Sequence, residues 1–196
     1  MNHEMKKAAV IFPGIGYHTD KPLLYYGKKI AEKAGYHIIE VPYGNFETGI
    51  KGDPEKIQKA FVTAMSQTET MLQAEDFSVY QELLFISKSI GTAVAVAYAQ
   101  KHKIRARQIL FTPVEDTFSC LEMSEKKDRK NTMLAFYGTG DSWMSTGIVN
   151  KKCGEYGIRL KTYASANHSL ETGNVKQDIL ILSDVMQECD EFINCE

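Results

Sequence analysis

The chain of 196 residues is long enough to bury a sizeable core, and 43% hydrophobic and 24% charged residues are typical of a soluble globular protein. A formal net charge of −2 excludes the basic field that binding to nucleic acid or to an anionic membrane would require. We find neither a signal-peptide pattern nor an apolar run long enough to cross a bilayer, and we therefore expect a cytoplasmic protein. The four cysteines match no metal or redox spacing and are expected to be reduced thiols.

Short apolar runs alternate with segments of helical periodicity along the chain. The runs predict strands at 8–12, 37–41, 83–86, 108–112, 132–137 and 158–163. The periodic segments predict helices at 21–34, 53–72, 92–99, 143–153 and 174–189. We assign no element to 114–131, and we expect its charged end at 125–130 to be a solvated turn. The alternation predicts a single domain over residues 1–196, a three-layer α/β/α sandwich with a mainly parallel six-stranded sheet.

The stretch from 82 to 101 predicts a buried strand, a sharp turn and a helix rich in small residues. Its turn, Ser87-Lys88-Ser89-Ile90-Gly91, matches the nucleophile elbow Gly-x-Ser-x-Gly at every position except the first. Such a turn would hold the Ser89 hydroxyl at the carboxyl edge of the sheet, beside the N-terminus of a helix. The alternative is that Ser89 only caps that helix.

Two further polar residues follow later strands and would lie at the same edge of the sheet. Asp141 comes after the fifth predicted strand and His168 after the sixth. A serine hydroxyl needs a base to take its proton, and the base needs a carboxylate to orient it. We therefore predict a triad of Ser89 as nucleophile, His168 as base and Asp141 as acid. The alternatives are that Asp141 caps the helix that follows it and that His168 is a surface loop residue.

Negative charge on a substrate carbonyl oxygen would need preorganised N–H donors. We expect the backbone N–H groups of Ile90 and Ile15 to form this oxyanion hole, because Ile90 follows the nucleophile and Ile15 lies in the loop after the first strand. The remaining candidates for substrate binding are Gly14, Gly16, Tyr17, His18 and Trp143. This mechanism requires no metal and no organic cofactor. The expected partner is a small-molecule acyl substrate, with no nucleic acid and no membrane, and the sequence does not indicate an oligomeric state.

These motifs resemble those of the α/β-hydrolase-fold family, and the resemblance covers nearly the whole chain. The segments that carry it are 12–17, 87–91, 138–141 and 167–171. The resemblance implies a minimal α/β-hydrolase fold without a cap domain, and a serine esterase-like site in which Ser89, Asp141 and His168 act as nucleophile, acid and base. Two features depart from the family pattern: Ser87 replaces the usual first glycine, and the two strands that commonly open the fold are missing.

Three functions fit the sequence. The first is a serine hydrolase, such as a carboxylesterase or a thioesterase, that works through an acyl-enzyme. The second is a binding protein that keeps the fold without chemistry, since the family includes inactive members. The third is a dinucleotide-binding oxidoreductase, suggested by Gly14-x-Gly16 and a later Glu40, although Thr19 occupies the third glycine position.

The substrate pocket is less clearly marked in the sequence than the triad. We expect the loops 43–52 and 114–131 to cover the site, because no capping domain fits in this length. Four residues are candidates for an apolar acyl pocket or for the core: Phe118, Leu121, Met123 and Trp143. A small or medium acyl group is the substrate that we expect.

Overall fold

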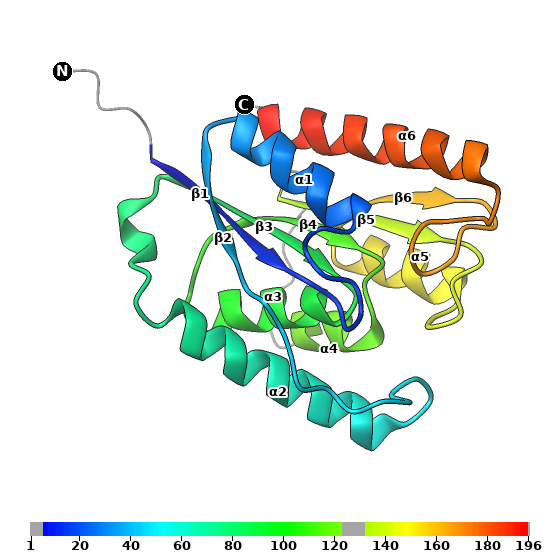
Figure 1. Ribbon diagram of the computed structural model, residues 1–196, viewed down its shortest axis with the longest axis horizontal. Helices are drawn as coiled ribbons and strands as arrows, with labels where there is room; N and C mark the ends of the chain where they lie inside the picture. Colours follow the sequence, from blue (N-terminus) through cyan, green and yellow to red (C-terminus); the bar gives the residue numbers. More distant parts are fainter. Residues whose placement is uncertain (1–5, 123–131, 196) are drawn as a thin grey trace.

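The computed structural model describes residues 6–122 and 132–195, and these form a six-stranded sheet in the order β2-β1-β3-β4-β5-β6 (Figure 1). All pairings between neighbouring strands are parallel. The strands are β1 (Lys7–Phe12), β2 (Tyr36–Glu40), β3 (Glu82–Lys88), β4 (Arg107–Phe111), β5 (Met133–Gly138) and β6 (Arg159–Tyr163). Because parallel strands point the same way, the loops that follow them meet at one edge of the sheet.

Helices cover both faces of this sheet, so the predicted three-layer sandwich is confirmed. On one face lie α1 (Pro22–Lys33) and α6 (Val175–Asn194), which run side by side in Figure 1. On the other lie α2 (Pro54–Leu72), α3 (Ile90–Lys101), α4 (Glu115–Glu122) and α5 (Thr146–Glu155). A short 3₁₀ turn, η1 (Phe77–Val79), precedes β3.

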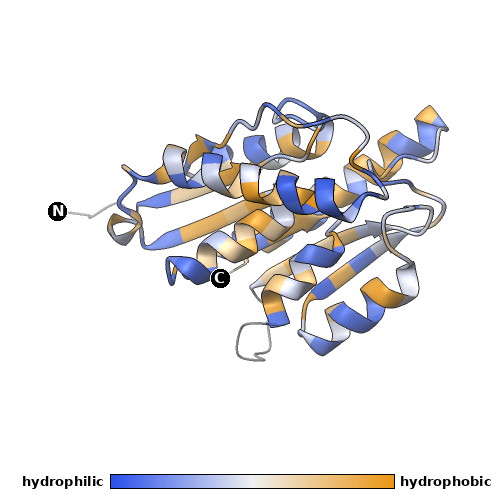
Figure 2. Cartoon of the chain, turned by 90° about the horizontal axis from the view of Figure 1, so that it is seen from below, coloured by the Kyte–Doolittle hydropathy of each residue, from blue (hydrophilic) through white to orange (hydrophobic). Residues whose placement is uncertain are grey.

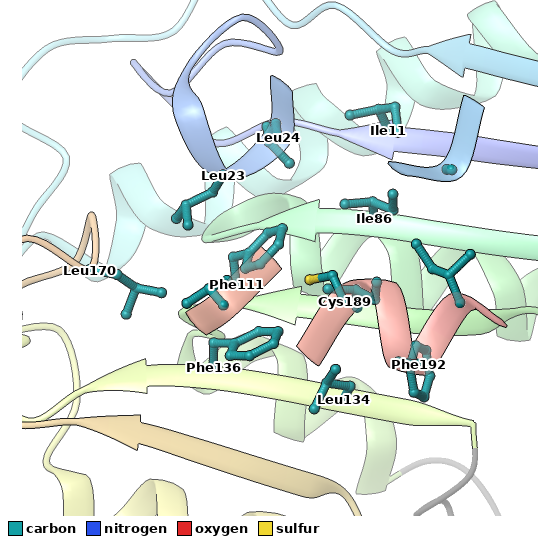
Figure 3. Close-up of a cluster of buried hydrophobic side chains, with 14 of the residues drawn as sticks. Ile11, Leu23, Leu24, Ile86, Phe111, Leu134, Phe136, Leu170, Cys189 and Phe192 are labelled. Atoms are coloured by element: carbon teal, nitrogen blue, oxygen red, sulfur yellow. The ribbon is translucent and has the colours of Figure 1, made fainter. Parts of the chain in front are cut away.

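The two faces of the sheet have separate cores, which follow from the alternation of side chains along each strand. Ile11 and Ile86 point toward α1 and α6, where Figure 3 shows them beside Leu24 and Cys189. Their neighbours in sequence, such as Phe85, pack against α2 and α3 instead. Figure 2 shows the resulting pattern, with apolar strands between helices that are polar on their outer sides. Strands buried on both faces explain why the central runs show no polar alternation.

The predicted helices differ from the observed ones mainly at their ends. The segment left unassigned contains α4, a helix of two turns whose few buried residues give too short a pattern to recognise. The last helix continues to Asn194, because Phe192 and Ile193 pack into the core. Lys21 directly precedes α1, and its side chain makes no capping hydrogen bond. The predicted turn at 125–130 lies outside the described residues.

Candidate active site

Ser89 is the single residue between β3 and α3, and its backbone is strained. Its φ of 55° and ψ of −126° lie in a region that residues with a Cβ atom seldom adopt. The Ser89 N–H donates to the carbonyl oxygen of Phe111 at 3.0 Å, which ties the turn to the end of β4. The Ser89 side chain makes no capping hydrogen bond to α3. The predicted strand–turn–helix is confirmed, and the capping alternative for Ser89 is wrong.

The two outer positions of the elbow have different steric requirements. A Cβ atom on Gly91 would lie 2.4 Å from the carbonyl oxygens of both Phe12 and Pro13, so only glycine fits there. Ser87 is fully buried at the end of β3, and its hydroxyl donates to the carbonyl oxygen of Ile109 at 3.0 Å. The serine at the first position therefore fits the turn and has a hydrogen-bond partner.

Three residues far apart in the sequence meet at this elbow. Ser89 Oγ lies 2.8 Å from Nε2 of His168, and Nδ1 of His168 lies 2.6 Å from Oδ2 of Asp141. The Asp141 side chain is 0% exposed and that of His168 is 23% exposed. An ionised carboxylate only accepts, so Nδ1 carries the proton and Nε2 is free to accept from the serine hydroxyl. The structure thus brings together the three side chains that the sequence predicts for a triad.

The backbone around Asp141 and His168 holds both side chains in place. Oδ1 of Asp141 accepts from the backbone N–H of Trp143 at 2.9 Å. Trp143 precedes α5, which is capped by Ser145, so the alternative that Asp141 caps this helix is wrong. The loops after β5 and β6 are in close contact, because a Cβ atom on Gly138 would lie 2.1 Å from the carbonyl oxygen of Ala166. This glycine allows the loop that carries Asp141 (138–141, here called the acid loop) and the loop that carries His168 (167–171, the base loop) to approach each other.

Burial and neighbouring charges set the protonation states of the pair. Burial disfavours the charged form of His168 and lowers its pKa; the hydrogen bond to Asp141 opposes this shift, and the charges of Lys88 and Lys51 add to it. For Asp141 burial acts to raise the pKa, but the hydrogen bond and charge of His168 outweigh it and hold the pKa below its usual value. A neutral imidazole beside a carboxylate is the state in which the ring can accept a proton.

The segment after β1 is a tight hairpin that lies against Ser89. Gly14 and Tyr17 exchange two backbone hydrogen bonds of 3.1 and 3.2 Å, which places Ile15 and Gly16 at the tip. A Cβ atom on Gly14 would lie 3.1 Å from the Cβ of Ser89. Within the described residues, the backbone N–H groups of Ile15 and Ile90 make no hydrogen bond. They remain our predicted oxyanion donors.

The other predicted binding residues have different environments. The ring of Trp143 packs against the imidazole of His168, with centroids 5.5 Å apart. Tyr17 is buried, and its hydroxyl accepts from the backbone N–H of Leu23 at 3.2 Å. The side chain of His18 is 67% exposed and lies 3.9 Å from Asp20, so it does not join the triad.

A cavity of about 440 Å³ lies beside the base loop. Its walls come from the hairpin after β1, the start of α1, the residues after His168 and one side of α6. Lining residues include Tyr17, Leu23, Leu170, Val175, Ile179 and Leu182. Two of the residues considered for an acyl pocket, Phe118 and Leu121, are instead buried in the core under α4. A third, Met123, lies outside the described residues.

The sequence did not single out three residues near the triad, which are Lys88, Thr112 and Lys51. Lys88 is buried inside the elbow, and its ammonium donates to the hydroxyl of Thr112, which follows β4. Lys51 reaches over the ring of Trp143 from the loop before α2 and hydrogen-bonds Ser142. The contacts of these three residues join distant parts of the chain, so the sequence around each residue does not mark them. The one exception is the position of Lys88 within the elbow motif.

The glycines after β1 do not form a dinucleotide-binding turn. In that fingerprint the glycines open a helix whose N-terminus binds the pyrophosphate. Here Gly14 and Gly16 belong to the hairpin, and α1 begins only at Pro22. Glu40, the candidate for the ribose, pairs with Lys28 at 2.5 Å. The geometry therefore disfavours the oxidoreductase alternative.

Residues 6–122 and 132–195 contain no disulfide, no membrane-spanning helix and no metal-binding cluster. All four cysteines are free thiols. No helix there is both long and apolar enough to span a membrane. No group of three or more His, Cys, Asp or Glu side chains in those ranges is arranged to hold a metal ion.

Comparisons with known proteins identify the fold. No family model matches the sequence, and no curated protein resembles it in sequence. Est1E from Butyrivibrio proteoclasticus, also solved with ferulic acid bound, is similar in structure, with a TM-score of 0.62, 12% identity, and coverage of 98% of this chain and 90% of that one. An α/β serine hydrolase homologue from Coxiella burnetii has a TM-score of 0.56, 13% identity and coverage of 93% and 87%.

A lidless structure is also among the similar proteins. The α/β serine hydrolase without a lid from Xanthomonas campestris has a TM-score of 0.51, 12% identity and coverage of 95% and 84%. In the part of the chain that the structure describes, no additional helix or strand lies between a strand and the helix that follows it at the carboxyl edge. The sheet order, the elbow after β3 and these similarities together show that this chain has the α/β-hydrolase fold.

Proposed function

We propose that this protein is a serine hydrolase that cleaves a carboxylic ester or a related acyl compound through an acyl-enzyme. The observation that carries the proposal is the chain of contacts from Ser89 Oγ through His168 to the buried carboxylate of Asp141, at 2.8 and 2.6 Å. His168 would take the proton of the hydroxyl as Ser89 attacks the acyl carbon, and would return it to the leaving group. Water would then attack the acyl-enzyme with the same base.

The hairpin after β1 supports the second requirement, which is stabilisation of the oxyanion. In our proposal the developing negative charge is bound by the N–H groups of Ile90 and Ile15. Ile90 is the first residue of α3, where the helix N-terminus also favours negative charge. The proposal is supported by the closeness of the hairpin to Ser89, since a Cβ atom on Gly14 would lie 3.1 Å from the Cβ of Ser89.

Labelling with a fluorophosphonate tests the nucleophile. The wild-type protein should be labelled and lose activity in parallel, and Ser89→Ala should do neither. Ser119→Ala is the control, because this exposed serine on α4 hydrogen-bonds the carbonyl oxygen of Glu115 and neither contacts the triad nor lines the cavity. If Ser89→Ala is labelled as strongly as the wild type, or if Ser89→Ala hydrolyses esters as fast as the wild type, the proposal is wrong. A protein that is neither labelled nor active on a broad ester panel would favour the binding-protein alternative.

The acyl group would occupy the cavity of about 440 Å³ beside the base loop. This volume is within the range of small-molecule sites, and the walls are mostly apolar side chains. Tyr17 and Leu170 connect the cavity to the hairpin and to the base loop, respectively. An apolar cavity of this size suits a small or medium acyl chain, and thioesters of the same acyl groups are also compatible with it.

Two neighbouring residues on α6 provide a matched test of this pocket. Ile179 lines the cavity and is 61% exposed, whereas Leu180 is 64% exposed and does not line it. Ile179→Trp should lower kcat/KM for long nitrophenyl esters relative to the acetate by about tenfold, since one or two misplaced methylene groups cost that much. Leu180→Trp should leave the chain-length profile unchanged. If both variants or neither change the profile, the acyl group binds elsewhere.

A further inference from the structure

Lys88 is a buried cation at the centre of the site, although the proposed chemistry does not use it. The residue is the last of β3 and immediately precedes the nucleophile, yet it is only 1% exposed. Its Nζ donates to the hydroxyl of Thr112 at 2.6 Å and lies 5.0 Å from the centre of the Tyr17 ring. Among the described residues no carboxylate forms an ion pair with it. A lysine buried in this way costs stability, which suggests that its position serves another purpose.

Thr112 connects this lysine to the base loop. Its hydroxyl accepts from Lys88 and donates to the backbone carbonyl oxygen of His168 at 3.2 Å. The Thr112 backbone has a φ of 45°, which is unfavourable for a β-branched residue, and its N–H donates to the carbonyl oxygen of Phe136 at 2.8 Å. A strained backbone that aims a hydroxyl at both Lys88 and the base loop is typical of functional sites.

These contacts join four segments that otherwise meet only at the edge of the sheet. Tyr17 belongs to the hairpin after β1, Lys88 to the elbow after β3, Thr112 to the end of β4, and His168 to the loop after β6. Each of these segments carries or adjoins a group of the proposed machinery. A change in the Lys88 side chain would therefore affect the hairpin and the histidine together.

The charged and titratable groups that face Lys88 come from each of its neighbours. They are Tyr17 from the hairpin, Lys21 from the residue before α1, Asp141 after β5 and His168 after β6. Burial lowers the pKa of Lys88 to about 7, while the Asp141 charge opposes that shift and Lys21 adds to it. When protonated, Lys88 favours the carboxylate of Asp141 and disfavours the charged form of His168. Both effects favour the resting protonation states of a proton-accepting pair.

We propose that Lys88 is a positioning residue, which fixes the backbone of His168 through the Thr112 hydroxyl and the hairpin through the face of Tyr17. The expected effect of Lys88 on the reaction rate rests on the proposed hydrolase function. Its effect on the positions of His168 and the hairpin does not depend on turnover. Lys88 does not touch the reacting atoms, so it acts through the residues that it holds.

The kinetic test is a double-mutant cycle with Lys88→Met and Thr112→Val, measured with the best ester from the nitrophenyl panel. Each single variant should lower kcat about tenfold with KM within about twofold, because groups that act as a unit position the base rather than bind the substrate. The double variant should lose no more than about the same factor in kcat, since either change breaks the same hydrogen-bonded link from Lys88 through Thr112 to His168. Losses that multiply, or a wild-type kcat in both single variants, would overturn the proposal.

Two control variants separate positioning from general damage. Thr112→Ser keeps the hydroxyl and should restore most of the activity that Thr112→Val loses. Ser87→Ala removes another buried hydrogen bond on the same strand, to Ile109, and should leave kcat near the wild-type value. If Ser87→Ala is as inactive as Lys88→Met, the loss reflects the packing of β3, and the positioning role is wrong.

A measurement without turnover keeps the proposal separate from the hydrolase function. The Nδ1 proton of His168, held against Asp141 at 2.6 Å, should give a low-field proton NMR signal in the wild type and in Ser89→Ala. Lys88→Met and Thr112→Val should broaden or shift this signal in the Ser89→Ala background, whereas Thr112→Ser should not. If the signal is unchanged in both, Lys88 does not position His168, whether or not the protein hydrolyses esters.

Discussion

The ring of Trp143 lies against the imidazole of His168, tilted by 33° with centroids 5.5 Å apart, while the backbone N–H of the same tryptophan binds Asp141. One residue therefore contacts both the proposed base and the proposed acid, by different parts of its structure. The side chain packs against the imidazole ring, and the backbone N–H binds the carboxylate. A substitution can remove the first contact without removing the second.

Trp143→Ala should lower kcat about tenfold and leave the folded state intact, because a partly exposed ring that positions the base is lost while the N–H to Asp141 remains. Trp143→Phe, which keeps an aromatic face, should recover most of the activity. The measurement is kcat on a reactive nitrophenyl ester together with thermal unfolding. Equal kcat in Trp143→Ala and wild type would show that the ring does not restrain His168.

Asp141→Asn should lower kcat by about 10³-fold or more, because an amide beside Nδ1 no longer selects the tautomer whose Nε2 accepts the serine proton. The rate of fluorophosphonate labelling should fall with kcat. Asp20→Asn is the matched control, since this carboxylate is exposed and distant from the triad contacts. A labelling rate that stays at the wild-type level in Asp141→Asn would contradict the assigned role of the acid.

The pH profile of kcat/KM should have its acid limb below pH 6.5, since burial lowers the pKa of His168. The sign follows from the reaction: protonated His168 cannot accept the serine proton, so activity falls as the pH drops through the lowered pKa. Lys51→Met removes a positive charge that lowers this pKa, and should move the acid limb toward higher pH. Because Lys51 is exposed, the difference should shrink in high salt. A limb that moves to lower pH in Lys51→Met would contradict the electrostatic account.

Lys88→Met should stabilise the fold even as it lowers activity. The pKa of Lys88 is about 7 in the folded state and near the usual lysine value when unfolded, so the unfolded chain binds more protons between these pH values. The free-energy cost of burying Lys88 is therefore greatest below pH 7 and declines as the pH rises toward 10. We expect Lys88→Met to be more stable by about 2 kcal/mol at pH 6.5, with a smaller gain at pH 9.5. Urea unfolding at both pH values checks this, and a gain that grows with pH would be the wrong sign.

Gly91→Ala should destabilise the fold by about 3 kcal/mol or more, because its Cβ would lie 2.4 Å from two backbone carbonyl oxygens that cannot move independently of β1. Gly147→Ala is the contrast: it lies within α5 with no atom within 4 Å of its Cβ position, and should gain about 0.5 to 1 kcal/mol. Thermal unfolding measures both. If the two variants have similar stability, the close approach of α3 to the end of β1 is not as described.

The sequence was sufficient to predict the sheet and the meeting of Ser89, Asp141 and His168 at its edge, because both leave local patterns. Strands such as 83–86 are continuous apolar runs, and polar residues that directly follow parallel strands must lie at one edge. Ser89, Asp141 and His168 could be found in this way without any knowledge of tertiary contacts.

What the sequence did not reveal depends on contacts between distant segments. Phe118 and Leu121 were candidates for an acyl pocket or for the core, and only the fold decides between them, because α4 packs both into the core. The link from Lys88 through Thr112 to His168 spans three strand ends, and no periodicity within one segment marks it. The cavity beside α6 likewise combines residues near 17, 170 and 179, which only the folded chain brings together.

The unusual torsion angles of Ser89 have a consequence for how a substrate is met. The conformational penalty of this residue is overcome once, during folding, by the surrounding sheet and helix, so the folded chain itself holds the hydroxyl against His168. In the proposed reaction, an incoming acyl compound would therefore meet a hydroxyl that needs no induced rearrangement. We therefore expect selectivity among substrates to arise from the shape of the entrance and the cavity rather than from assembly of the reactive groups on binding.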